Sequence, residues 1–234
     1  ELLKIKESIP VCSKLCLFGN FYKDIIVEGG FWKDSQINSL GNYTINEVRK
    51  LTKEVVNQKT ILLPTQWNLF EDTKALLNNL LPFIKNNNIQ LLIKTHPKEP
   101  DTSLNWFKRY EESAKQNVKV FSTEIDLYSL LSKVNLVVGY YSTSLLEAVA
   151  VGVPVITVTT PEISQGMHSF ISTNKLKKAI KIAGSVDDVI YLTHSYFNNE
   201  SFKNEWKEEI NVMGDYIYNK NYDANIIKLI RTFV

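Results

Sequence analysis

Residues 139–156, GYYSTSLLEAVAVGVPVI, contain the pattern that decides the fold. The apolar run at 135–139 leads into this stretch and predicts a short buried strand, and the run at 154–158 predicts a second one. Between them, residues 143–151 have the pattern of a helix, which Gly152 ends because glycine readily adopts the conformation that follows a helix. The stretch therefore predicts a strand, a helix and a strand in succession.

The same alternation extends toward the N-terminus. Three more apolar runs predict strands at 60–64, 89–94 and 118–121, and segments with helical spacing predict helices at 69–86, 103–116 and 126–133. Strands that are apolar throughout indicate a parallel sheet with both faces covered. Because crossover connections are right-handed, we expect an α/β fold with a Rossmann-like, doubly wound parallel sheet.

The two ends of the chain lack this alternation. Toward the N-terminus we expect a short strand at 15–19, a glycine-rich loop at 27–34, and a helix at 44–57 with Thr44 and Glu47 as its capping box. After residue 160 we expect a loop and additional C-terminal helices at 174–183, 186–197, 201–218 and 223–233. The predicted domains are a linker segment with a short strand and a helix at 1–57, and a Rossmann-like domain with C-terminal helices at 58–234.

The composition is that of an ordinary globular protein. Of the 234 residues, 44% are hydrophobic and 22% are charged, and the formal net charge of +2 gives no basic surface for nucleic acid. No apolar run approaches the roughly 18 residues that a membrane span needs, and no secretory signal opens the chain. Cys12 and Cys16 are too few for a zinc site and lack redox spacing. We expect a cytoplasmic protein, peripheral at the inner face of the cell membrane; the absent initiator Met suggests a fragment or a trimmed chain.

Polar side chains follow four of the predicted strands. Ligands of an open parallel sheet bind outside the carboxyl ends of its strands, so the residues at these ends are the candidates for binding. The candidates are Thr65, Gln66 and Trp67 after the first strand, Lys94, His96 and Pro97 at the second, Ser122 and Glu124 after the third, and Ser142, Thr143 and Ser144 after the fourth. Their concentration predicts a polar site at this edge of the sheet.

Three successive hydroxyls, Ser142, Thr143 and Ser144, lie where the predicted helix at 143–151 begins. Free backbone N–H groups and the helix dipole make such a terminus an anion site, and phosphate is its usual ligand. Ser144 and Glu147 also have the spacing of a capping box, which would serve the helix without any ligand. Capping alone explains one hydroxyl and the carboxylate, so the other hydroxyls favour a phosphate site.

Two histidines follow predicted strands. His96 lies at the end of the strand at 89–94, where an imidazole can donate to a phosphate oxygen, and Pro97 restricts its backbone. His168 follows the strand at 154–158 and can also reach the cleft. For each histidine, a surface position without a ligand is the alternative.

Several common enzyme motifs are absent from the sequence. There is no Walker A motif, no GxGxxG after the first strand and no GxSxG elbow, which argues against P-loop phosphotransferases, nicotinamide dehydrogenases and α/β-hydrolases. No Asp-x-Asp pair follows a strand, so no carboxylate seat for Mg²⁺ or Mn²⁺ is evident. We therefore expect no metal and no cofactor, with ligand charge met by the helix dipole, hydroxyls, His96 and Lys94.

Three motifs together resemble a known family. They are LLIKTHP at 91–97, DLYSLL at 126–131, and YSTSLLEA at 141–148 followed by Pro154 and Val155. In this order they resemble the carboxyl-terminal, donor-binding domain of GT-B transferases, above all CDP-glycerol glycerophosphotransferases and bacterial capsule sialyl- and Kdo-transferases. ILLPTQW at 61–67 is similar to the first strand and loop of that domain.

The resemblance implies roles for individual residues. By it, His96, Ser142 and Thr143 hold the phosphate of a donor nucleotide of the CMP, CDP or UDP type, and Glu147 binds ribose hydroxyls. It also implies a polysaccharide or polyol phosphate acceptor, bound by an amino-terminal domain for which residues 1–57 are too short. The catalytic base would belong to that domain.

The sequence favours the donor-binding part of a transferase that builds a bacterial surface polysaccharide or a teichoic-acid-like polymer. In this hypothesis, the negative charge that grows on the leaving phosphate is stabilised by the helix terminus, Ser142, Thr143 and His96, which requires His96 and Ser142 to face one small anion. Two alternatives stay open. One is an isomerase or hydrolase of the UDP-N-acetylglucosamine 2-epimerase kind, and the other is a non-catalytic Rossmann-like module.

Overall fold

The computed structural model describes residues 12–30, 32–50, 58–159 and 175–233. The chain is divided into two compact units. Unit 1 comprises Glu1–Leu51 and Val212–Val234, and unit 2 comprises Thr52–Asn211. Among the described residues, no helix is both long and apolar enough to cross a membrane.

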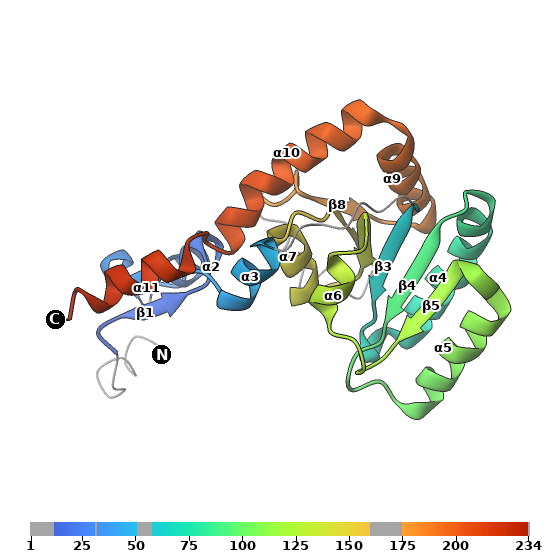
Figure 1. The fold of residues 1–234 in the computed structure, drawn as a ribbon, viewed down its shortest axis with the longest axis horizontal. Helices are drawn as coiled ribbons and strands as arrows, with labels where there is room; N and C mark the ends of the chain where they lie inside the picture. The colour runs from blue at the N-terminus through green and yellow to red at the C-terminus, as the bar shows by residue number, and fades with distance from the viewer. Residues whose placement is uncertain (1–11, 31, 51–57, 160–174, 234) are drawn as a thin grey trace. The chain divides into compact units, whose positions relative to one another are not determined.

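Unit 2 is built on a six-stranded sheet in which every neighbouring pair is parallel (Figure 1). Its strands are β3 (Thr60–Pro64), β4 (Gln90–Lys94), β5 (Val118–Phe121), β6 (Leu136–Gly139), β7 (Val155–Val158) and β8 (Ile180–Ala183), arranged in the order β5-β4-β3-β6-β7-β8. The predicted Rossmann-like, doubly wound sheet is thereby confirmed. The central strands β3, β6 and β7 are buried along their whole length, as expected where helices cover both faces.

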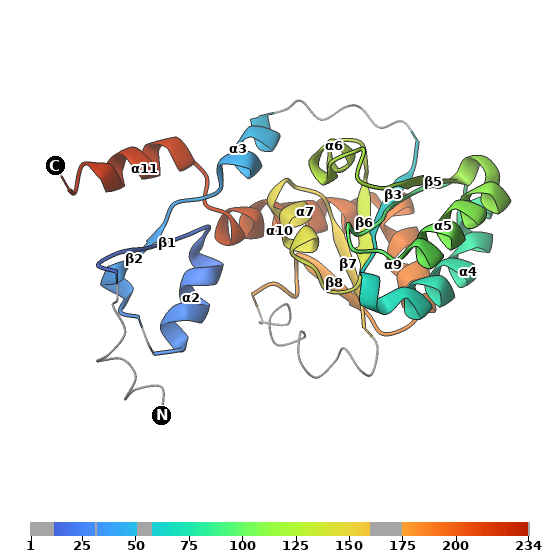
Figure 2. The same ribbon diagram turned by 90° about the horizontal axis from the view of Figure 1, so that it is seen from below.

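Helices cover the sheet on both faces. α4 (Phe70–Asn86), α5 (Asp101–Ala114) and α9 (Val186–Asn198) lie on one face, and α6 (Leu127–Leu131) and α7 (Thr143–Ala150) lie on the other (Figures 1 and 2). α10 (Glu200–Ile217) places Trp206 in the core, where its indole N–H donates to the Ala179 carbonyl oxygen at 2.7 Å. Short 3₁₀ turns precede α4 (Trp67–Leu69) and follow α5 (Lys115–Asn117).

The helix predicted at 174–183 is wrong, because β8 occupies the end of this range. β8 pairs with β7 in the register Val155↔Ile180 to Val158↔Ala183 and forms one edge of the sheet. Its outer side is only half-covered, since Lys181 is half-buried and Ile182 is 39% exposed. Four residues carry too short a pattern to identify a strand, so pairing with β7 decides the structure here.

Unit 1 brings both ends of the chain together. Its two parallel strands are β1 (Leu15–Leu17) and β2 (Ile37–Ser39), accompanied by α2 (Asn20–Glu28), α3 (Tyr43–Lys50), α11 (Tyr222–Ile230) and a 3₁₀ turn at Asp34–Gln36. The Asn219 N–H donates to the Phe18 carbonyl oxygen at 2.8 Å, and the Tyr216 hydroxyl donates to Asp24. Residues 212–234 thus group with the N-terminal segment, whereas the sequence-based division placed them with the Rossmann-like domain.

Two local predictions in unit 1 need correction. The loop predicted at 27–34 begins later than expected, because α2 continues to Glu28. The predicted capping box of Thr44 and Glu47 is also displaced, since the Asn42 side chain accepts a hydrogen bond from the Ile45 N–H at 3.1 Å. Asparagine is as good a cap as threonine, and α3 accordingly begins at Tyr43, before the expected cap.

Substitution of Gly19 tests the association of the two chain ends in unit 1. A Cβ at Gly19 would lie 2.2 Å from the Ile217 carbonyl oxygen, while its φ of −165° is accessible to any residue. We expect Gly19→Ala to lower the free energy of unfolding by about 1–3 kcal/mol through steric overlap alone. The measurement is urea unfolding followed by circular dichroism.

Gly29→Ala is the matched control for this substitution. Gly29 has a right-handed helical φ of −66°, and a Cβ there would meet nothing closer than 3.4 Å. We expect this variant to be as stable as the parent or slightly more stable. Equal stability of Gly19→Ala and Gly29→Ala would contradict the packing of Gly19 against Ile217.

Candidate functional site

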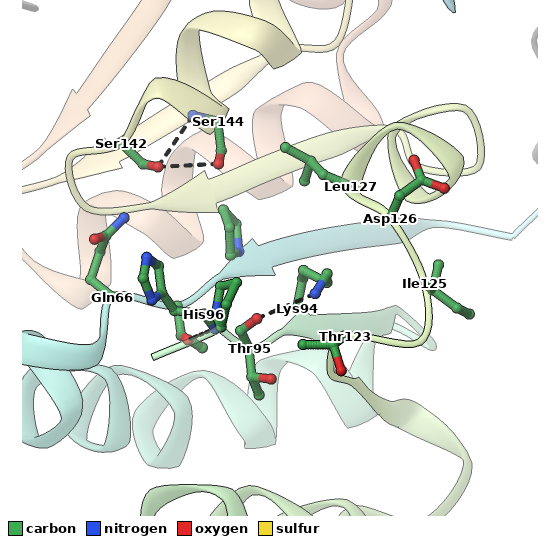
Figure 3. A pocket seen from close by; sticks show the side chains of 13 residues that line it. Gln66, Lys94, Thr95, His96, Thr123, Ile125, Asp126, Leu127, Ser142 and Ser144 are labelled. Carbon is green, nitrogen blue, oxygen red and sulfur yellow. Dashed lines mark hydrogen bonds between the residues drawn. The ribbon is translucent and has the colours of Figure 1, made fainter. Parts of the chain in front are cut away.

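A pocket of about 310 Å³ lies where the strand order of the sheet reverses (Figure 3). From β3 the chain proceeds outward to β4 and β5, then crosses back to β6 beside β3, which leaves a crevice at the carboxyl ends of these strands. The lining residues come from four strand ends and are Pro64, Thr65, Gln66, Lys94, Thr95, His96, Pro97, Thr123, Ile125, Asp126, Leu127, Ser142 and Ser144.

The pocket brings together most of the residues predicted for the site. Those that line it are Thr65, Gln66, Lys94, His96, Pro97, Ser142 and Ser144. In Figure 3 the His96 ring extends from the end of β4 toward the side of the pocket where Ser142 and Ser144 lie. His96 and Ser142 therefore face the same cavity, as the hypothesis of a shared anion requires.

The N-terminus of α7 presents two serine hydroxyls to this pocket. Ser142 is the N-cap, and its Oγ accepts from the Ser144 N–H at 3.2 Å and donates to Ser144 Oγ at 3.1 Å. Ser144 Oγ accepts in this bond and keeps its own proton to donate to a ligand. The capping box expected for Ser144 and Glu147 is not formed, because Ser142 caps the helix.

His96 is held by its own loop. Its Nδ1 accepts from the Lys98 N–H at 3.0 Å, and its backbone N–H donates to Thr65 Oγ1 at 3.0 Å. Since Nδ1 is an acceptor, the neutral ring carries its proton on Nε2. The atom left to meet a ligand is thus a hydrogen-bond donor.

Lys94 brings a positive charge to the pocket and is partly committed to the protein. Its ammonium donates to the Ser122 carbonyl oxygen and, at 3.3 Å, to the Thr95 carbonyl oxygen. Partial burial lowers the pKa of Lys94, and the carboxylates of Glu124 and Asp126 act in the opposite direction. These bonds join the ends of β4 and β5 and leave one of its three N–H donors for a ligand.

Asp126 is a carboxylate of the pocket lining whose two oxygens are both engaged. As the N-cap of α6 it accepts from the Ser129 N–H at 3.0 Å and from the Ser129 hydroxyl, and these bonds lower the pKa of Asp126. Among the described residues, no group of three or more His, Cys, Asp or Glu side chains is arranged to hold a metal ion.

Some predicted residues do not line the pocket. Thr143 is exposed on α7, Trp67 is 48% exposed, and Ser122 donates to Glu124 through both its N–H and its hydroxyl. The Ser122 hydroxyl, together with the backbone N–H groups of Glu124 and Ser122, lowers the pKa of exposed Glu124 to about 2. His168 lies outside the described residues.

Glu147 also lies away from the pocket lining and has a protein partner. Its Oε1 accepts from the Tyr128 hydroxyl at 3.2 Å. Burial raises the pKa of Glu147, and burial together with the Glu147 charge raises the pKa of Tyr128 to about 12. The pair joins α7 to α6.

Thr95 and Thr123 follow predicted strands but were not chosen as site residues from the sequence, and Ile125, Asp126 and Leu127 were not considered for the site. Thr123, Ile125, Asp126 and Leu127 line the pocket with Thr95, and the apolar pair gives it a less polar wall. The signal was present, because Asp126 begins the helix predicted at 126–133. The prediction considered only the residues directly after the strand.

A sequence model of the family described as "putative O-antigen biosynthesis protein" matches residues 19–170 of the chain. This match includes the pocket residues from Pro64 to Ser144. No curated protein sequence matches the chain.

Three solved structures show the fold in other proteins. A glycosyltransferase from Rickettsia africae ESF-5 has a TM-score of 0.60 at 15% identity over 98% of this chain and 66% of that chain. The UDP-GlcNAc 2-epimerase of Neisseria meningitidis bound to UDP-GlcNAc has a TM-score of 0.65 at 15% identity over 94% and 61%. The wall teichoic acid polymerase TagF with CDPG has a TM-score of 0.58 at 14% identity over 94% and 56%.

These similarities establish a Rossmann-like fold of the GT-B type. At sequence identities of 14–15%, the comparison supports similarity of fold and does not extend to activity or ligand. The chain spans 56–66% of the length of these three proteins.

Substitution of Thr65 tests how much its buried hydroxyl, which lies between Glu99 and His96, contributes to stability. Thr65 is 3% exposed, and its hydroxyl donates to Glu99 Oε1 at 2.6 Å while accepting from the His96 N–H. Thr65→Val keeps the volume but leaves both partners without this hydroxyl, so we expect a loss of about 1–3 kcal/mol in the free energy of unfolding. Thr65→Ser, which loses only a methyl group, is the control for urea unfolding. A Thr65→Val protein as stable as Thr65→Ser would contradict this role.

Proposed function

The chain belongs to the O-antigen biosynthesis family, and we propose that its pocket binds the phosphates of a nucleotide-activated donor in a transferase of surface-polymer synthesis. The donor in this proposal is a sugar or a polyol phosphate activated by CMP, CDP or UDP. One observation carries the proposal: His96, Ser142, Ser144 and the N-terminus of α7 all meet in one pocket at the reversal of the strand order.

The chemistry of the pocket fits an anion. His96 Nε2, the Ser144 hydroxyl, the first turn of α7 and Lys94 supply hydrogen-bond donors or positive charge from different strand ends. Phosphate oxygens are acceptors and carry negative charge, so they match each of these groups. A pocket of a few hundred cubic ångströms is also of the usual size for a small-molecule ligand.

In the proposed reaction these groups act on the leaving group. When the bond between the transferred group and the donor phosphate breaks, negative charge grows on the phosphate oxygens. Hydrogen-bond donors of the pocket that are already in place before the reaction stabilise this charge without reorganising, which lowers the barrier to transfer. Thr143, which carried part of this role in the sequence-based hypothesis, is replaced by Ser144 because Thr143 is exposed and Ser144 lines the pocket.

The proposal needs no metal ion in the pocket. Asp126, whose carboxylate lines it, has both oxygens bound to Ser129, so neither is disposed to coordinate a cation that bridges phosphates. The acceptor in the proposal is a polysaccharide or a polyol phosphate. Since solved proteins of this fold are longer than this chain, we assign acceptor binding and the catalytic base to additional protein. Reaction on the cytoplasmic side, at the membrane surface, is part of the same proposal.

Nucleotide binding tests the proposal directly. In a screen of CMP, CDP, UMP, UDP and GDP, we expect CMP, CDP or UDP to raise the melting temperature of the parent selectively, because a ligand that binds only the folded state stabilises it. His96→Ala and the double variant Ser142→Ala/Ser144→Ala each remove donors from the phosphate site. We expect each to weaken binding roughly tenfold or more, as measured by calorimetry.

Two matched controls accompany these variants. His194→Ala removes an exposed histidine on α9 and is the control for His96→Ala. Ser185→Ala removes the N-cap of α9 and is the control for the serine pair. The Ser185 Oγ accepts from the Asp188 N–H, just as Ser142 Oγ accepts from the Ser144 N–H. Ser185→Ala should lower stability without changing affinity, and EDTA should leave the parent's affinity unchanged. Parent-like affinity of both pocket variants would refute the proposal, and the absence of any nucleotide binding would favour a non-catalytic module.

The reaction type is tested by incubating the parent with donor alone and with donor plus acceptor. A transferase should release free nucleotide at a high rate only when acceptor is present. An epimerase or hydrolase would convert UDP-N-acetylglucosamine without acceptor, into an epimer or a free sugar detectable by NMR. That outcome would contradict the proposed transfer and favour isomerisation or hydrolysis, and it would be compatible with the proposed phosphate site.

A further inference from the structure

Three hydrogen bonds hold His96 in the loop between β4 and α5. The backbone N–H donates to Thr65 Oγ1, the backbone carbonyl accepts from the Glu99 N–H, and ring Nδ1 accepts from the Lys98 N–H, each at 3.0 Å. The two backbone bonds fix the course of the loop and are open to any residue, whereas the bond to Nδ1 is specific to an imidazole ring. Together they determine which ring nitrogen faces the pocket.

Glu99 lies behind this loop and does not line the pocket. Its side chain is buried, with 8% of the residue exposed, and its Oε1 accepts from Thr65 Oγ1 at 2.6 Å. A threonine hydroxyl has a single proton, so its donation to Glu99 leaves a lone pair directed at the His96 N–H. Glu99 thereby orients the Thr65 hydroxyl, and Thr65 in turn anchors the backbone of His96.

The second carboxylate oxygen of Glu99 lacks a hydrogen bond like the one that Oε1 accepts from Thr65. Glu99 Oε2 is buried, and within the part of the chain that the structure describes no donor reaches it. A buried oxygen without a hydrogen bond destabilises the folded state. Residues that break a packing rule in this way are concentrated at functional sites, where their contribution is to geometry rather than to stability.

We propose that Glu99 is a positioning residue that acts through Thr65 to direct the Nε2–H of His96 at the donor phosphate. This inference rests on the proposed function of the pocket for its role in binding. The link from Glu99 to the His96 ring is a separate claim that can be measured without any ligand.

A pair of substitutions separates positioning from packing. Glu99→Leu removes the acceptor for Thr65 and keeps an apolar side chain of similar size in the buried position, whereas Glu99→Gln keeps a side-chain oxygen acceptor. Since the carboxylate is only half satisfied, we expect Glu99→Leu to be as stable as the parent or more stable. We expect its affinity for the nucleotide that the parent binds among CMP, CDP and UDP to fall roughly tenfold, and we expect Glu99→Gln to keep most of the parent's affinity.

The double variant with His96→Ala tests whether Glu99 acts through His96. If it does, Glu99→Leu should cause no further loss of affinity once His96 is absent, so the two effects will be strongly non-additive. The inference would be overturned if the losses of nucleotide affinity in the two single variants multiplied in the double variant. It would also be overturned if Glu99→Leu bound nucleotide as tightly as the parent. Thr65→Val interrupts the same link from its other end and replaces Glu99→Leu in the cycle should that variant fail to fold.

The His96 ring itself gives a second readout, by ¹⁵N NMR without nucleotide. The parent and Glu99→Gln should show one neutral tautomer, with the proton on Nε2, and Glu99→Leu should show a mixture of tautomers. An unchanged single tautomer in Glu99→Leu would refute the positioning link whatever the affinities are. A parent that shows the expected tautomers but binds none of CMP, CDP and UDP would refute the proposed function and leave the link standing.

Discussion

Parallel pairing on both sides of β3 is the constraint on which the rest of unit 2 depends. β3 pairs with β4 on one side and with β6 on the other, and all three strands end at the same edge of the sheet. A parallel strand must be followed by a crossover, so the chain leaves each strand end in a turn toward a helix. The turns after β3 and β6 therefore diverge to opposite faces, and the pocket lies between them.

This arrangement explains how weak local signals combine into one site. Ser142 at the start of α7 is an ordinary N-cap, and His96 is a histidine in a tight loop; neither alone distinguishes a ligand site from a helix cap or a satisfied side chain. The sheet brings them to one cavity, where the carboxylate of Asp126, although ionised, has both oxygens hydrogen-bonded to Ser129. The anion preference that we propose would thus be a property of the assembled edge.

The limits of prediction follow the range of the interactions concerned. Strands β3 to β7 were predicted because each is a short, mostly apolar segment between helical segments, and in β3, β6 and β7 burial of every residue is the direct cause. β8 was missed because its identity depends on its pairing with β7, and the grouping of residues 212–234 with the N-terminal segment depends on contacts such as Asn219 with Phe18. Glu99 escaped notice for the same reason, as its partner Thr65 is 34 residues away in the sequence.

By itself, the sequence determined the Rossmann-like alternation and the residues that follow each strand, because periodicity, helix caps and glycine stops act within a few residues. Only the tertiary structure decided which of those residues share a cavity. In the folded chain Ser144 and His96 line the pocket, whereas Thr143 is exposed to solvent. Glu147 accepts a hydrogen bond from Tyr128, and Glu124 accepts one from Ser122. A side chain's direction depends on the register of its strand and the rotation of its helix against neighbours distant in sequence, and no local pattern encodes these.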